Sequence, residues 1–346
     1  MKPKILSLCF LIALLSRAPA LFAFETDQYN LPPEPLADIG EEVAEYVEDN
    51  LHKAIEKINI EIARLQECRE SKRSDCDTPS RSKRLAHLRS EDAVARAVFE
   101  LLGDGTIPFT RSGTWMNSHK FRAQPARFKT GYRQSIFVYL PSDYFTISPT
   151  VKMYGHSFGT DKIAHFFQQG YTYYRIHKKS VAEGMTDAEA VKKSVSWGKM
   201  TESTYYGTFV GGVFSNADLY ANYAGMLFYQ GLVKSIAIGN VTRRPTLVLK
   251  NGVWVMNEPA GRLDLLAPFI SDHLNEALNP SLYLPGLRSS IRGIVRKRSC
   301  QGWKAAYPDR TQQDFERLTA SLIDWNGIEY GHKKSSKFIT IANTCF

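Results

Sequence analysis

Apolar residues recur at three- and four-residue steps between Leu36 and Glu67, while charged residues fill the intervening positions. The apolar stripe comprises Val47, Leu51, Ile55, Ile58, Ile62 and Leu65. This spacing is typical of an amphipathic helix. The pattern therefore predicts a long helix over residues 36–67, which packs on the rest of the chain or pairs with a neighbouring copy.

Helical spacing continues downstream. A second helix is expected at about Glu91–Leu102, and the block 160–232 is also predicted to be helical. Residues 69–84 are charged and rich in serine, which predicts a surface loop between the first two helices. Further helices are expected over residues 262–278, 287–298 and 311–324.

Two segments predict β structure. The run Ile136–Tyr139 favours a strand within residues 135–140, because proline, glycine and serine surround it. Asn251-Gly252 separates two β-prone segments and predicts a hairpin over residues 245–256. The expected fold class is mainly α: a helical domain with a minor β part, made of the strand near 135–140 and the hairpin near 245–256.

The amino end has the three parts of a secretory signal. Two lysines precede the apolar run Ile5–Leu15, and small residues follow it. The run is shorter than the roughly 20 apolar residues that span a bilayer. We therefore expect a signal peptide over residues 1–23, cleaved after Ala20 or Ala23, and an exported chain, periplasmic or extracellular, without a transmembrane span. An N-terminal helical region over 24–104 and a main domain over 105–346 are expected to follow.

The net positive charge indicates which class of molecule the protein could bind. The formal charge of +9 falls by three, to +6, when residues 1–23 are removed, because they contain three basic residues and no acid. Outside the cytoplasm, an anionic envelope lipid or wall polymer is a more available partner than nucleic acid, and we expect no nucleic-acid binding. Arg288, Arg292 and Arg296 repeat every four residues on a predicted helix. That basic face could lie on an anionic surface or simply be solvated.

Four cysteines remain after the signal is removed: Cys68, Cys76, Cys300 and Cys345. An even number in an oxidising compartment predicts two disulfides. Of the three possible pairings, we expect the local one, Cys68 with Cys76 and Cys300 with Cys345. A structural role is favoured over catalysis, because no Cys-x-x-Cys spacing is present.

The block 158–232 carries the candidate chemistry. Asp161 and His165 are four residues apart and share a helical face, and Asp218 and Asn222 repeat that spacing two helices later. Glu202 falls near a predicted helix end, where the helix dipole disfavours an acid, so a partner is expected. Short connections favour antiparallel helices whose facing side chains meet. The candidate site is therefore Asp161, His165, Glu202, Asp218 and Asn222.

Three interpretations of these five residues stay open. They could form a proton-transfer site, with His165 as the base and Asp161 as its orienting partner, in a hydrolase that acts on an envelope lipid or wall component. They could bind a divalent metal through oxygen and imidazole ligands. They could also form a buried hydrogen-bond network in a non-catalytic envelope protein, which binds a partner through its long helix or basic face.

The same segment resembles two families. The order Asp-Lys-x-x-His-Phe, a Glu, and then Ser-x-x-Asp-x-x-x-Asn-x-x-Gly is similar to VanZ-like proteins and to a family of small predicted periplasmic lipoproteins. The matching positions are Asp161, Lys162, His165, Glu202, Ser215, Asp218, Asn222 and Gly225. The match covers about residues 158–231. VanZ-like proteins are embedded in the membrane and often have Gln where this chain has Tyr205. The resemblance implies a shared helical site and an envelope setting.

Two further polar motifs compete with this cluster. Gly155-His156-Ser157-Phe158-Gly159 matches the nucleophile elbow of α/β-hydrolases and would make Ser157 the nucleophile of a serine esterase. Its candidate partners are Asp272, His273 and His332. His273 and Glu276 are three apart on a predicted helix. They could add ligands to the main cluster, but a solvated face is favoured.

Overall fold

The computed structural model describes residues 25–71, 76, 78–107, 109–139, 147–204, 207–208, 211–257, 265–331 and 337–346. The predicted signal peptide, Tyr205 and His332 lie outside these residues. The described chain is mainly helical, and its strands form small two-stranded antiparallel sheets, which confirms the predicted fold class. Among the described helices, none is long and apolar enough to span a bilayer.

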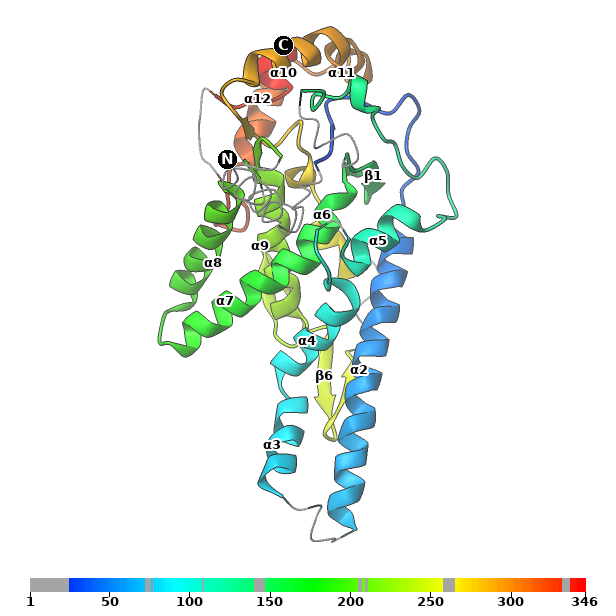
Figure 1. Ribbon diagram of the computed structural model, residues 1–346, viewed down its shortest axis with the longest axis vertical. Coiled ribbons are helices and arrows are strands. Elements are labelled where there is room, and N and C mark those ends of the chain that lie inside the picture. The colour runs from blue at the N-terminus through cyan, green and yellow to red at the C-terminus, as the bar shows by residue number, and fades with distance from the viewer. Residues whose placement is uncertain are drawn as a thin grey trace, which may run out of the picture.

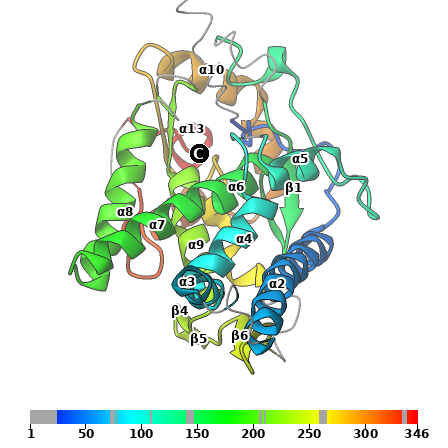
Figure 2. The same cartoon turned by 60° about the horizontal axis from the view of Figure 1, so that its bottom comes forward.

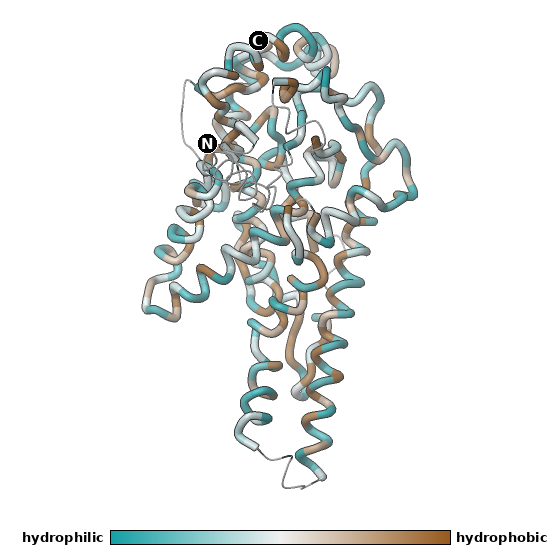
Figure 3. The backbone as a smooth tube through the Cα atoms, viewed as in Figure 1, coloured by the Kyte–Doolittle hydropathy of each residue, from teal (hydrophilic) through white to brown (hydrophobic). Residues whose placement is uncertain are grey.

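The long helix α2, Gly40–Glu70, forms one side of an elongated projection (Figure 1). It begins four residues later than predicted, because the Asp38 carboxylate accepts a hydrogen bond from the Gly40 N–H. Apolar and polar residues alternate along it (Figure 3), and its apolar stripe is buried from Val47 to Ile62, while Leu65 is half-buried. The helix α4, Glu91–Leu102, lies beside α2 and has the predicted bounds.

The predicted loop over 69–84 is partly wrong, because helix α3, Pro79–Leu88, begins inside it. Thr78 caps this helix through its side chain, and Pro79 occupies the first position, where a missing N–H costs nothing. Leu85 and Leu88 are buried against the projection. The sequence did not predict α3, because the segment is rich in serine and arginine and only two of its helical residues are buried.

The predicted hairpin is confirmed as β6, Leu247–Lys250, and β7, Val253–Met256. Asn251 and Gly252 both have positive φ, 51° and 81°, as a tight hairpin turn requires. The other strand pairs are β1 (Thr150–Met153) with β2 (His156–Gly159), β3 (Val213–Ser215) with β8 (Ser281–Tyr283), and β4 (Ile236–Ile238) with β5 (Val241–Arg243).

Two predicted elements are wrong. Residues 136–139 form turns, not a strand. The Ile136 and Phe137 side chains are buried, but their N–H groups donate to the Asp27 carboxylate and the Ser135 hydroxyl instead of to a neighbouring strand. The predicted helix 262–278 is absent from its described part, 265–278. That part holds only two 3₁₀ turns, η5 (Ala267–Phe269) and η6 (Asp272–Leu274).

The central helix is α9, Asn216–Gly231, which is buried on almost every side. Helix α7, Gly170–Ala182, packs against it, and α8, Asp187–Glu202, packs against both, as the two views show (Figures 1 and 2). Gly170 and Gly225 form the crossing point, since a Cβ on Gly170 would lie 2.6 Å from the Gly225 Cα. This close approach places α9 against the short helix α6, Thr160–Ala164.

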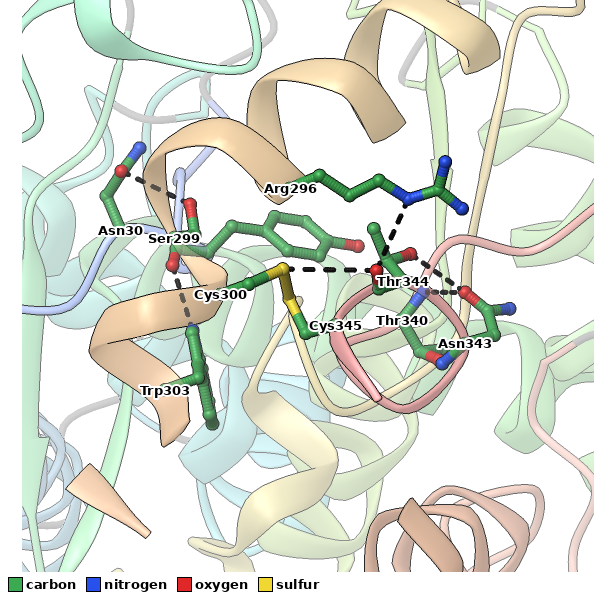
Figure 4. Close-up of a disulfide and its surroundings, with 10 residues drawn as sticks. Asn30, Arg296, Ser299, Cys300, Trp303, Thr340, Asn343, Thr344 and Cys345 are labelled. Atoms are coloured by element: carbon green, nitrogen blue, oxygen red, sulfur yellow. Dashed lines mark hydrogen bonds between the residues drawn. A yellow bond between two sulfur atoms is a disulfide. The ribbon is translucent and has the colours of Figure 1, made fainter. Parts of the chain in front are cut away.

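The carboxyl-terminal helices gather at the end opposite the projection (Figure 1). They are α10 (Arg288–Arg298), α11 (Cys300–Ala306), α12 (Gln312–Ser321) and α13 (Ala342–Cys345). The predicted disulfide pairing is confirmed: Cys68 bonds to Cys76 and Cys300 bonds to Cys345. The second bond joins α11 to α13 (Figure 4).

The arginines of α10 are only partly available to a partner. Arg288, Arg292 and Arg296 donate to the backbone carbonyl groups of Tyr283, Phe338 and Thr344. Arg292 and Arg296 therefore hold the terminal segment in place, and Figure 4 shows the Arg296 contact beside the disulfide. The main apolar core is continuous from α2 and α4 to α7 and α9, across the predicted boundary between residues 104 and 105.

Candidate functional site

A buried lysine lies at the centre of the candidate site. The Lys162 Nζ atom is 2.7 Å from Asp161 Oδ2, 2.5 Å from Asp218 Oδ1 and 2.5 Å from Glu276 Oε1, and its side chain has no exposed surface. We call the surrounding group the Lys162 cluster. Its members are Glu25, Asp161, Lys162, His165, Glu202, Asp218, Asn222 and Glu276. All are at least 95% buried.

The geometry around His165 comes from a π turn. Residues His165–Gln169 (η3) form one turn of π-helix, in which the Gly170 N–H donates to the His165 carbonyl five residues back. The His165 Nδ1 atom lies 3.1 Å from Asn222 Oδ1. Because a carboxamide oxygen only accepts hydrogen bonds, Nδ1 donates. The Nε2 atom then faces Asp218 Oδ2 at 3.5 Å. His165 is thus held between two side chains of α9.

Glu202 joins the cluster through the start of α9. Its Oε1 atom accepts a hydrogen bond of 3.0 Å from the Ser215 N–H. The Ser215 hydroxyl caps α9 by accepting from the Asp218 N–H, and it donates to Glu276 Oε1 at 2.5 Å. The partner expected for an acid at a helix end is therefore a backbone amide at the positive end of the next helix.

The five sequence-predicted residues, Asp161, His165, Glu202, Asp218 and Asn222, are thus brought together in one hydrogen-bonded and ion-paired network. The other three positions of the family resemblance also take part. Lys162 is the central cation, Ser215 links Glu202 to Glu276, and Gly225 allows the helix crossing.

Glu276 corrects the expectation of a solvated face. Its side chain is 3% exposed and bonds to Lys162, and the Ser281 hydroxyl donates to its second oxygen at 2.7 Å. His273 stacks on Tyr220 and is not part of the cluster. The sequence leaves Glu276 open as an addition to the cluster but favours a solvated face, because it predicts a helix that is absent from the described residues around Glu276.

The segment directly after the predicted signal is the other contribution that the sequence missed. Residues 25–28 are all at least 97% buried. The Thr26 hydroxyl donates to Asp161 Oδ1 at 2.6 Å, and Gln28 Oε1 accepts from the Glu276 N–H at 2.6 Å. Four consecutive polar residues have no apolar periodicity, so no pattern indicated that they enter the core.

Negative charge exceeds positive charge in the cluster. Five acids surround one lysine and one histidine, so even a doubly protonated His165 would leave three carboxylates without a counter-charge. Burial raises the pKa of Glu25, Glu202 and Glu276, and Asp218 adds to the rise in each. Burial alone would lower the pKa of Lys162, but the surrounding acids more than offset this and raise it. Bound protons or a cation must take up the excess.

This arrangement has two chemical capacities. Protonated acids beside an imidazole can donate and accept protons. Clustered carboxylates and an imidazole can also bind a divalent cation. Two pockets lined by described residues lie away from the cluster. One borders α2, the other lies between α8 and residues 324–329, and neither includes a residue of the cluster.

Ser157 lies in a different context from the one that a nucleophile elbow requires. The motif occupies the β1–β2 hairpin, and Ser157 pairs with Lys152 in the middle of β2. An elbow instead presents its serine on a sharp turn from strand to helix. His156 Nδ1 lies 2.7 Å from Asp272 Oδ1, which raises the pKa of His156, and this pair is part-buried. No bond from this pair to the Ser157 hydroxyl is found among the described residues.

Comparisons with protein-family models, with curated proteins and with solved structures find no match to this chain.

Proposed function

We propose that the protein is an exported, non-catalytic protein of the cell envelope, in which the Lys162 cluster fixes the packing of the core. The observation that carries this proposal is the combination of burial and bonding. The Lys162 side chain, which extends from α6, forms ion pairs with Asp218 of α9 and with Glu276 in the segment before β8. It has no exposed surface. A catalytic cluster needs a path for substrate, whereas a packing network needs full burial and satisfied partners.

The envelope setting rests on the sequence and is supported by the covalent structure. The amino end has the composition of a cleavable signal. Both disulfides are of the kind that persists in oxidising compartments. We also propose kinship with VanZ-like proteins and the small periplasmic lipoproteins, because every position of that resemblance has a role in the cluster or in the helix crossing beside it.

The proposed partner is an anionic lipid surface. Arg296, Lys297 and Arg298 on α10 are exposed, and Lys304 and Arg310 lie exposed on and after α11. A cluster of this kind attracts an acidic membrane surface, and each basic residue near the surface adds to the attraction. We expect the purified protein to sediment with phosphatidylglycerol vesicles and not with phosphatidylcholine vesicles.

A charge-reversal pair tests the surface. Lys297→Glu with Arg298→Glu should reduce sedimentation, whereas the same reversal at Lys53 and Lys192, which are exposed on α2 and α8, should not. Equal sedimentation of both double variants would contradict a specific basic surface. Export is tested separately by cell fractionation and by sequencing the amino end of the mature chain, which should begin at Leu21 or Phe24.

A test for hydrolase activity can contradict the proposed packing role. The purified protein is incubated with extracted envelope lipids and with cell-wall polymer, and products are followed by mass spectrometry. We expect no products beyond those of a His165→Ala control. Products released by the wild type and lost in His165→Ala would show that the cluster is catalytic and that the packing role is not its function.

A further inference from the structure

We propose that the Lys162 cluster binds one divalent cation through Glu25, Asp161 and Asp218. A cation site goes beyond the packing role, because it assigns the cluster a ligand. Three parts of the fold supply the side chains: the segment before α2, α6 and α9.

The carboxylate spacing fits an ion. One oxygen each from Glu25, Asp161 and Asp218 lies within 4.8 Å of the other two. Ligands on opposite sides of Mg²⁺ or Ca²⁺ are separated by twice the metal–oxygen distance, roughly 4 to 5 Å. The three acids are therefore already grouped at the separations that a coordination shell requires.

His165 lies beside this group and is not one of the grouped ligands. Its Nδ1 donates to Asn222 Oδ1, and its Nε2 lies 3.5 Å from Asp218 Oδ2. It therefore holds Asp218 in position next to the other two acids, as residues around a metal ligand commonly do.

An independent observation comes from Tyr173 on α7. Its side chain is fully buried, and its hydroxyl has no hydrogen-bond partner in the described chain. The hydroxyl belongs to the same region: burial raises its pKa, and the charges of Glu202 and Asp218 raise it further, while the Asn222 carboxamide lies close enough to oppose the rise. Buried hydroxyl groups normally have partners. Water bound to a cation beside Asn222 would supply one.

The ligand set indicates the class of ion. Three carboxylates select oxygen-preferring cations such as Mg²⁺, Ca²⁺ and Mn²⁺. Because the ligands come from distant segments and are at least 95% buried, the site forms only on folding. The ion must therefore be taken up while the chain folds.

The test is a refolding experiment on the mature chain with its disulfides intact. The protein is unfolded in guanidinium with EDTA, desalted, and refolded with Mn²⁺, Mg²⁺, Ca²⁺ or EDTA. Bound metal is then measured by mass spectrometry after gel filtration, and Tm by calorimetry. We expect about one Mn²⁺ per chain and a higher Tm than in EDTA. No retained metal with any of the three ions and an unchanged Tm would overturn the proposal.

Two variants test whether the retained metal is bound at this site. Glu25→Gln removes one ligand without touching the ion pairs of Lys162, and it should weaken Mn²⁺ retention at least 10-fold. Asp272→Asn is the control, because Asp272 pairs with His156 outside the cluster. Undiminished Mn²⁺ in folded Glu25→Gln, or equal loss in both variants, would contradict the site. Failure of metal binding would leave the packing role intact, since that role is tested by the search for products.

Discussion

Lys162 and Asp218 form the contact that joins α6 to α9: their charged atoms lie 2.5 Å apart, and neither side chain is more than 2% exposed. The same ammonium group binds Asp161 and Glu276. A buried ion pair contributes little on balance, yet the loss of one partner is costly, because the other charge stays buried without compensation. The stability of the fold should therefore depend strongly on Lys162.

Lys162→Met should destabilise the protein by about 3 kcal/mol or more, since methionine fills a similar volume but leaves the acids without their cation. Guanidinium unfolding with the disulfides intact measures the change. Lys192→Met is the matched control, because Lys192 is exposed on α8. It should change the free energy of unfolding by less than about 0.5 kcal/mol. Equal midpoints for the two variants would contradict a packing role for the cluster.

Local patterns predicted much of this fold. The stripe of α2 and the Asn251-Gly252 hairpin both appear where the spacing placed them. Each depends on contacts within one element, so periodicity and turn chemistry suffice. The grouping of Asp161 with Asp218 was also predictable, because short turns force successive helices together.

The missing members of the cluster depend on contacts between distant segments. Glu25 and Glu276 enter it from irregular backbone in two segments far apart in the chain, where no periodicity exists. Lys162 was noted only as a matching position, because a lysine is normally exposed and its complete burial follows from three acids that meet in space. Such non-local compensation of charge leaves no pattern in the sequence.

The helix crossing gives a second prediction. A Cβ at Gly225 would collide with the Phe166 carbonyl oxygen, which is backbone and cannot move aside. Gly225→Ala should therefore push α9 away from η3 and cost about 1 to 3 kcal/mol, despite the better helix propensity of alanine. Gly293→Ala on α10 is the control, since a Cβ there meets nothing within 4 Å. Thermal unfolding should show a lower Tm for the first variant and an unchanged or higher Tm for the second.

The disulfides should differ in their contributions. The Cys300–Cys345 bond closes a separation of 45 residues and the Cys68–Cys76 bond one of 8, so chain entropy predicts about 4 and about 2.5 kcal/mol respectively. The terminal bond also supports the cluster, because the Ile341 N–H donates to the Ala277 carbonyl beside Glu276. Paired Cys→Ser variants, compared by guanidinium unfolding, should show the larger loss for Cys300 and Cys345. A larger loss for the Cys68 pair would contradict this order.

Glu202 should make the folded state less stable as the pH rises. Burial and the charge of Asp218 raise the pKa of its carboxyl above the ordinary value of 4.5. The folded chain therefore keeps a proton that the unfolded chain releases above about pH 4.5. Stability from this group is complete below that pH and falls by up to ~1.4 kcal/mol per pH unit until the raised pKa is passed. The other charged or titratable groups of the cluster in which it lies are Glu25, Asp161, Lys162, His165, Asp218 and Glu276.

Glu202→Gln should remove this slope, because an amide can still accept from the Ser215 N–H and never ionises. Relative to the wild type, the variant should gain stability steadily between pH 5 and pH 7, measured as the Tm in EDTA across that range. Glu189→Gln on the same helix is the opposing control: its hydrogen bonds to Thr186 lower the pKa of Glu189, so that stability is lost as the pH falls. It should therefore show no gain as the pH rises. A wild-type slope in Glu202→Gln would mean that Glu202 is ionised in the folded protein, with a cation rather than a proton balancing its charge.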